Sequence, residues 1–139
     1  CTYRLLTCGN HDNLAAHEPD TFEKLLGKSI VFLKESGLSI NGLNIWGSPR
    51  QPNLEGWPFG HKAGEEMRYF WQQLPSATHL LITHTPPLGV LDQNRAGQSL
   101  GCAELAKRLE EVQPALHIFG HVHASHFGYA LGNIRGASF

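Results

Sequence analysis

The chain has 139 residues, of which 41% are hydrophobic and 17% are charged, and this composition is typical of a globular domain rather than a disordered segment. A formal net charge of −1 excludes the strongly basic surface that recruits nucleic acid or anionic membranes. No run approaches the roughly 20 apolar residues of a membrane span, and there is no signal-peptide pattern. Three cysteines without CxxC spacing are typical of free thiols, so we expect a cytoplasmic protein.

Hydrophobic periodicity and turn residues predict alternating strands and helices, and hence a single α/β domain. In chain order we expect a strand at 3–8, a helix at 21–26, a strand at 30–34, a hairpin at 38–46, a helix at 62–74, a strand at 79–83, a helix at 102–112, a strand at 116–119 and two further short strands within 127–139.

Local signals mark several of the boundaries between these elements. Asp20, three residues before Glu23, resembles a capping box at the start of the first helix. Asn41-Gly42 between alternating flanks predicts a type I′ hairpin turn, and Pro114 ends the last helix. The second helix presents one apolar face, formed by Met67, Phe70, Trp71 and Leu74.

Polar residues follow three of the predicted strands directly. Asn10-His11-Asp12 comes after the first strand, His84 after the strand at 79–83, and His121-Val-His123 after the strand at 116–119. Strand ends of open α/β sheets collect ligands, and imidazole nitrogens and amide oxygens suit divalent metals. His117, within the last of these strands, is expected to point away from the core.

Each motif also has a structural interpretation. Asn10 taken alone fits an Asx turn after Gly9 better than a ligand, His84 could cap a loop carbonyl, and the two histidines near residue 121 could sit on a surface turn. The following His11 and Asp12 favour the ligand interpretation for Asn10.

Together the motifs GNHD (9–12), THTPP (83–87) and GHVH (120–123) resemble those of calcineurin-like metallophosphoesterases. The segments 45–49, 101–105 and 114–121 look like the MPPED subgroup, the metallophosphoesterase-domain proteins of the 239FB type. The resemblance implies that residues 1–139 are the C-terminal part of one such domain. The fold it implies is a partial four-layer αββα sandwich that lacks its N-terminal strands, because the family's DxH and GD motifs do not precede GNHD here.

The resemblance also implies roles for individual residues. Asn10, His84 and His121 would bind the second of two divalent metals (Mn, Mg, Zn or Fe), and His123 would bind the first. His11 would face the leaving oxygen as general acid, and Asp12 would orient a neighbouring imidazole. In the complete family site a hydroxide that bridges the metals attacks a phosphomonoester or phosphodiester.

Residue type and position alone suggest three more contacts with a small phosphorylated substrate, for which a nucleotide is a candidate. Arg50 could meet its phosphate or sugar, and Trp57 and Phe59 could stack on a base. The rival hypothesis is a non-catalytic protein on this fold that binds nucleotide or metal, and it is supported by the missing motifs. Nothing in the sequence indicates nucleic acid or a membrane as a partner.

Overall fold

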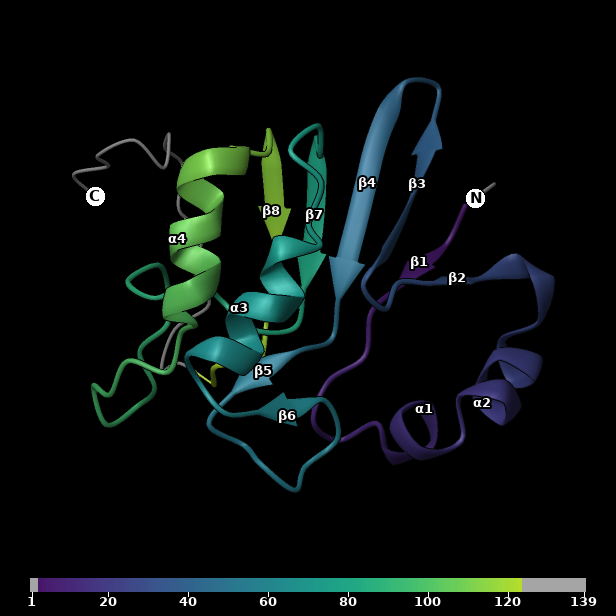
Figure 1. Cartoon of the computed structure of the whole chain (residues 1–139). Coiled ribbons are helices and arrows are strands. Elements are labelled where there is room, and N and C mark those ends of the chain that lie inside the picture. The colour runs from purple at the N-terminus through teal and green to yellow at the C-terminus, as the bar shows by residue number, and fades with distance from the viewer. Residues whose placement is uncertain (1–2, 124–139) are drawn as a thin grey trace.

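A four-stranded sheet forms the centre of the computed structural model, which describes residues 3–123 (Figure 1). Its strands run in the order β3-β4-β7-β8, with β4, β7 and β8 parallel and β3 antiparallel to β4. The strands span Ser36–Ile40 (β3), Leu43–Ser48 (β4), Leu80–Thr83 (β7) and Leu116–Ile118 (β8). The predicted α/β class is confirmed, and the expected strands at 127–139 lie outside the described residues.

The β3–β4 hairpin turns at Asn41 and Gly42, with φ of 50° and 82°. Both angles lie in the left-handed region that a type I′ turn requires. The hairpin prediction is therefore confirmed, and β3 begins two residues before the expected start because Ser36 pairs with Gly47.

Two helices, α3 (Glu65–Gln72) and α4 (Ala103–Val112), cover one face of this sheet (Figure 1). The core between them and the sheet consists of Trp46, Met67, Trp71, Leu74, Leu81, Cys102, Leu105, Leu109 and Val112. The start of α4 agrees with the prediction to one residue. The helix expected at 62–74 is shorter, because Gly64 at its N-cap has a φ of 91° that a helix cannot contain.

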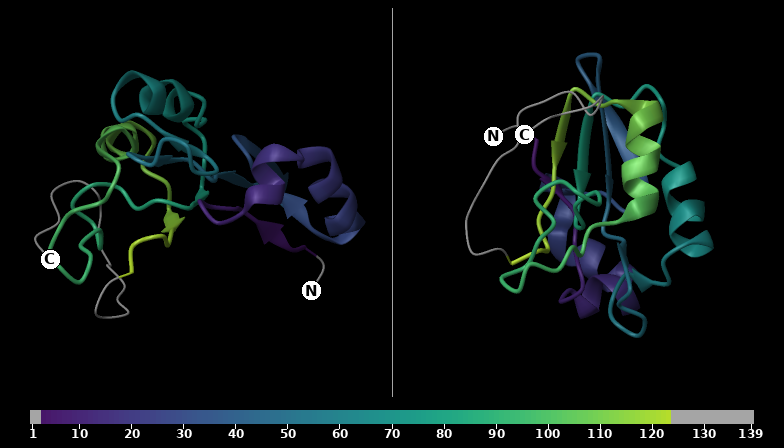
Figure 2. Two further views of the ribbon diagram at one scale, coloured as in Figure 1. Left: turned by 90° about the horizontal axis from the view of Figure 1, so that it is seen from below. Right: turned by 90° about the vertical axis from the view of Figure 1, so that its left-hand side faces the viewer.

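The N-terminal part forms a smaller unit at the far end of the molecule from α4 (Figure 2). Its two strands are parallel, and three short helices connect them: β1 (Leu5–Leu6), α1 (Asn13–His17), α2 (Pro19–Leu26), η1 (Gly27–Ser29) and β2 (Val31–Phe32). The predicted capping box is wrong. Pro19 takes the first helical position, and Glu18 is an N-cap without a side-chain hydrogen bond, since proline fixes the φ that a first turn needs.

The segment expected to be a loop between β4 and α3 contains one short parallel pair, β5 (Gln51–Pro52) and β6 (Gly60–His61). Buried Gln51 fastens the intervening turn, because its Nε2 donates to the Pro58 carbonyl at 2.7 Å. None of the helices among residues 3–123 is long and apolar enough to cross a membrane.

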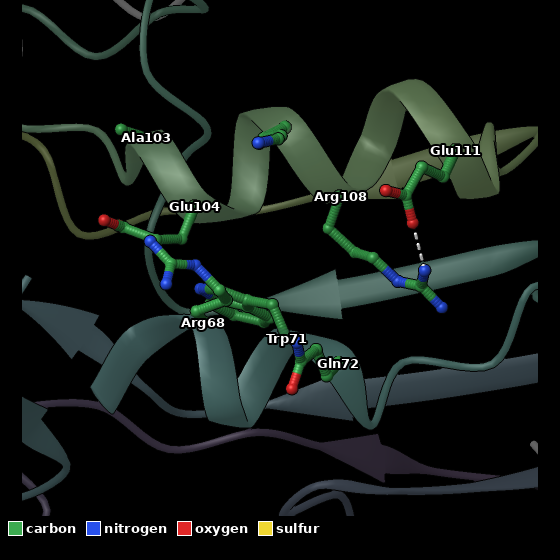
Figure 3. A pocket seen from close by; sticks show the side chains of 8 residues that line it. Arg68, Trp71, Gln72, Ala103, Glu104, Arg108 and Glu111 are labelled. Atoms are coloured by element: carbon green, nitrogen blue, oxygen red, sulfur yellow. Dashed lines mark hydrogen bonds and ion pairs between the residues drawn. The ribbon is translucent and has the colours of Figure 1, made fainter. Parts of the chain in front are cut away.

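A groove runs along the outer side of the two helices, between α3 and α4 (Figure 3). Trp71 lies at its floor, and charged side chains, including Arg68, Glu104 and Arg108, line it. Arg108 pairs with Glu111 there. No residue of the predicted metal site belongs to the lining.

His117 points the opposite way from the prediction. In β8 it is aligned with Leu81 of the core, while Leu116 and Ile118 on the uncovered face are 55% and 48% exposed. Its Nε2 lies 2.8 Å from the Thr83 hydroxyl. Because that hydroxyl donates to the Thr85 carbonyl, the imidazole is the donor in this contact and carries a proton on Nε2.

Acid should destabilise the protein through His117. Burial lowers its pKa to about 4 from an unfolded value of about 6.5, so between these values the unfolded chain binds more protons. The free energy of unfolding should therefore fall as the pH is lowered from about 6.5 to about 4. Urea unfolding of the native chain and of His117→Gln over this range should give a shallower pH dependence for the variant. Parallel curves would contradict a neutral buried His117.

Candidate metal centre

The loops that carry the predicted ligands meet at the carboxyl ends of the parallel strands. The His84 N–H donates to the Ser48 carbonyl at 3.0 Å, and the Gly120 N–H donates to the His84 carbonyl at 3.1 Å. These bonds continue the sheet pairing beyond β4, β7 and β8. The backbone at His84 is thereby fixed between the neighbouring strand ends, beside the loop that carries His121.

Asn10 and His84 are brought together although 74 positions separate them. Asn10 Oδ1 lies 2.9 Å from His84 Nε2. This is hydrogen-bond distance. It brings an amide oxygen and an imidazole nitrogen from two distant loops to one point, which two ligands of one metal require.

Gly9 allows this approach because the His84 ring lies directly against its Cα. A Cβ at position 9 would come within 2.1 Å of His84 Cε1 and 2.4 Å of Nε2. Any side chain at position 9 would thus occupy the place of the imidazole.

His121 is the third predicted ligand in the cluster, with its ring centroid 4.6 Å from that of His84. Its φ of 72° is unusual for a non-glycine residue, and such strain collects at functional sites. In the turn after Gly120, this backbone conformation orients the ring beside His84.

The imidazoles of this cluster are held in the neutral form that binds metals. Burial and then the nearby His121 lower the pKa of His84 to about 4. Burial and then His123 and His11 lower the pKa of His121. Neutral imidazoles keep the lone pair that a metal needs.

Within residues 3–123, no group of three or more His, Cys, Asp or Glu side chains is arranged to hold a metal. The convergent set consists of two imidazoles and one amide, and His123 is close enough to affect both imidazoles electrostatically. The donor atoms of this set, imidazole nitrogens and an amide oxygen, suit a first-row divalent metal.

Asp12 contacts the backbone of its own loop, and the role that the resemblance implies for it, orienting an imidazole, stays a prediction. Its Oδ2 accepts the Gly9 N–H at 2.7 Å, and its own N–H donates to the Gly9 carbonyl at 3.0 Å. It thereby closes the loop that presents Asn10. Burial and then Asp12 raise the pKa of Cys8 to about 12, so this thiol is neutral and is not a nucleophile.

His11 is exposed, and its ring meets Trp57 edge to face, with centroids 5.6 Å apart and an angle of 82°. Trp57 is 51% exposed, whereas Phe59 is 5% exposed. Trp57 is thus open to a ligand, and Phe59 belongs to the small core formed with Cys8 and Ala15.

Arg50 already has partners within the protein. Its guanidinium binds Glu35 through two nitrogens, at 3.0 and 2.9 Å, and lies 4.2 Å from the Phe70 ring centroid. Its Nη1 lies 2.8 Å from His61 Nε2. Phe70 therefore packs against Arg50 and His61 and not in the core. A phosphate contact for Arg50 stays a prediction.

Sequence reasoning did not find Glu35 or His61, because neither belongs to a motif. Glu35 adopts a φ of 45° in a turn, and its carboxylate also accepts the Ser48 hydroxyl at 2.8 Å. Ser48 in turn provides the carbonyl that fixes the His84 backbone. The Glu35–Arg50 pair therefore supports the strand end at which the site is built.

Comparison with known proteins identifies relatives along most of the chain. UPF0046 protein K07C11.7 of Caenorhabditis elegans is 38% identical in an alignment of 144 positions, which covers 94% of this chain and 49% of the relative. Metallophosphoesterase domain-containing protein 1 of Homo sapiens is 32% identical in an alignment of 145 positions, which covers 87% of this chain and 44% of the relative. The chain thus spans about half the length of these relatives.

A solved crystal structure shares the fold, with a TM-score of 0.64 at 18% identity over 88% of this chain and 52% of the other. No model of a protein family matches the sequence. The two sequence relatives and this shared α/β fold agree with the motifs at the strand ends. The chain belongs to the MPPED-type metallophosphoesterases.

Proposed function

We propose that the chain contributes to a metal-dependent phosphoesterase site that hydrolyses phosphomonoesters or phosphodiesters. The 2.9 Å approach of Asn10 Oδ1 to His84 Nε2 carries this proposal, because two candidate ligands from distant loops meet there. The names of the relatives support the same reaction class.

Asn10, His84 and His121 would hold one divalent ion, and His123 would contribute to a second. Bound divalent ions would activate water at neutral pH and offset the charge of the phosphoryl group. Asp12 holds the loop of Asn10 through the Gly9 N–H. His11, exposed beside the cluster, would give its proton to the departing oxygen.

The alternative is binding of metal or nucleotide without catalysis. It is favoured by one observation, namely that the convergent set among residues 3–123 consists of two imidazoles and one amide and includes no carboxylate. We therefore expect residues 1–139 alone to bind Mn²⁺ or Zn²⁺ without turnover of p-nitrophenyl phosphate.

The deciding experiment is hydrolysis of p-nitrophenyl phosphate and bis-p-nitrophenyl phosphate with Mn²⁺. It compares residues 1–139 with the same chain extended by whatever its gene encodes upstream of Cys1. Turnover by the extended form should fall about 100-fold or more in His11→Ala, while metal affinity stays within about twofold. Metal binding without turnover in both forms would favour the non-catalytic alternative.

A further inference from the structure

Trp57 is an aromatic side chain in direct contact with the proposed proton donor. The two rings meet edge to face, with the His11 and Trp57 centroids 5.6 Å apart. Aromatic pairs prefer edge-to-face or offset-stacked arrangements, and such a pair contributes about 0.5–1.5 kcal/mol beyond its burial. Trp57 is therefore placed to decide where the His11 ring points.

The turn that presents Trp57 is well anchored although the indole itself is exposed. The Trp57 N–H donates to the Leu54 carbonyl, and its carbonyl accepts the Gly60 N–H, both at 3.0 Å. The next two residues are also held in place. The Pro58 carbonyl accepts a hydrogen bond from the Gln51 side chain, and the Phe59 ring is buried. Because the backbone of this turn is already ordered, a ligand that meets the indole has only the side chain to order.

We propose that Trp57 is the positioning residue for His11 and forms the apolar wall on the leaving-group side of the site. The expected consequence is a preference for phosphoesters whose leaving group is a flat aromatic ring. That ring would lie against the indole while His11 faces the ester oxygen that joins the ring to phosphorus. This inference rests on the proposed function for its substrate class, but the positioning of His11 does not depend on it.

The fluorescence of Trp57 can be distinguished from that of the other two tryptophans. The chain has three tryptophans; Trp46 and Trp71 are 4% and 1% exposed, and Trp57 is 51% exposed. The red-shifted, acrylamide-accessible emission of the native protein therefore belongs to Trp57. A ring that stacks on the indole should protect only that component from quenching by acrylamide.

The test titrates phenylphosphonate and methylphosphonate into the Zn²⁺-loaded chain and into two variants, Trp57→Leu and Tyr69→Ala. Tyr69 is a matched control, because it is an exposed aromatic residue (64%) on α3. We expect phenylphosphonate to bind at least about tenfold more tightly than methylphosphonate and to protect Trp57 from quenching by acrylamide. Trp57→Leu should reduce this ratio to about threefold or less, and Tyr69→Ala should leave it unchanged; an unchanged ratio in Trp57→Leu overturns the wall.

NMR of the same proteins separates this inference from the proposed function. Native protein should show nuclear Overhauser contacts between the His11 and Trp57 rings, and His11 ring signals should shift in Trp57→Leu but not in Tyr69→Ala. If neither phosphonate binds, the proposed phosphoester site is wrong, and NMR alone then decides the positioning. His11 signals that do not change in Trp57→Leu overturn it.

Discussion

Gly9→Ala should separate Asn10 from His84 and weaken Zn²⁺ binding at least about tenfold. The added methyl would lie 2.1 Å from His84 Cε1 and 2.3 Å from Nδ1, so the imidazole must leave its place. Overpacking of this kind also costs about 1–3 kcal/mol of stability. We thus expect Gly9→Ala to lower both the affinity for Zn²⁺ and the free energy of unfolding.

Gly120→Ala is the matched control, because Gly120 also precedes a predicted ligand but a methyl group there would have nothing within 4 Å. Isothermal titration with Zn²⁺ and urea unfolding should show a large change for Gly9→Ala and little for Gly120→Ala. Equal metal affinity in the two variants would contradict the placement of the His84 ring against Gly9.

Arg50→Met should lower the free energy of unfolding by about 3 kcal/mol, because it leaves a largely buried carboxylate without its cation. The Arg50 and Glu35 side chains are only 15% and 11% exposed. Replacing both residues, as in Glu35→Met with Arg50→Met, should restore much of the lost stability, since no charge then stays buried.

Glu111→Gln is the control for Arg50→Met. It removes the partner of Arg108 on the surface of α4, where the Glu111 side chain is 61% exposed, and such pairs contribute about 1 kcal/mol or less. Urea unfolding of the four proteins makes the comparison. A loss below about 1 kcal/mol in Arg50→Met would mean that the Glu35–Arg50 pair does not hold the end of β4.

Local signals in the sequence predicted the elements that are governed by neighbouring residues. The β3–β4 hairpin follows from Asn41-Gly42, and α4 from its apolar spacing and Pro114. The two-residue strands β5 and β6 have no periodicity to detect. The start of α2 differs from the prediction because Pro19 takes the first helical position and the N-cap, Glu18, makes no side-chain hydrogen bond.

Long-range contacts could not be predicted in this way. His117 lies between apolar neighbours in β8, so alternation indicated that it faces outward, but the Thr83 hydroxyl on the next strand provides a partner on the core side. The Glu35–Arg50 pair joins two turns that have no shared motif. In both cases the deciding group is supplied by another strand or loop.

In the candidate site, too, the sequence indicated the motifs but not the contacts between loops. Motif order at three strand ends indicated that Asn10, His84 and His121 would converge, and the structure brings them together. The contact of Asp12 with Gly9 and that of Trp57 with His11 depend on loop geometry. No spacing in the sequence encodes either contact.

The most direct measurement is the anomalous scattering of crystals of this chain grown with Zn²⁺. We expect a metal peak between Asn10 Oδ1, His84 Nε2 and the His121 ring, and loss of that peak in His84→Ala. A peak elsewhere with these three residues unliganded, or no change in His84→Ala, would contradict a metal site at the strand ends.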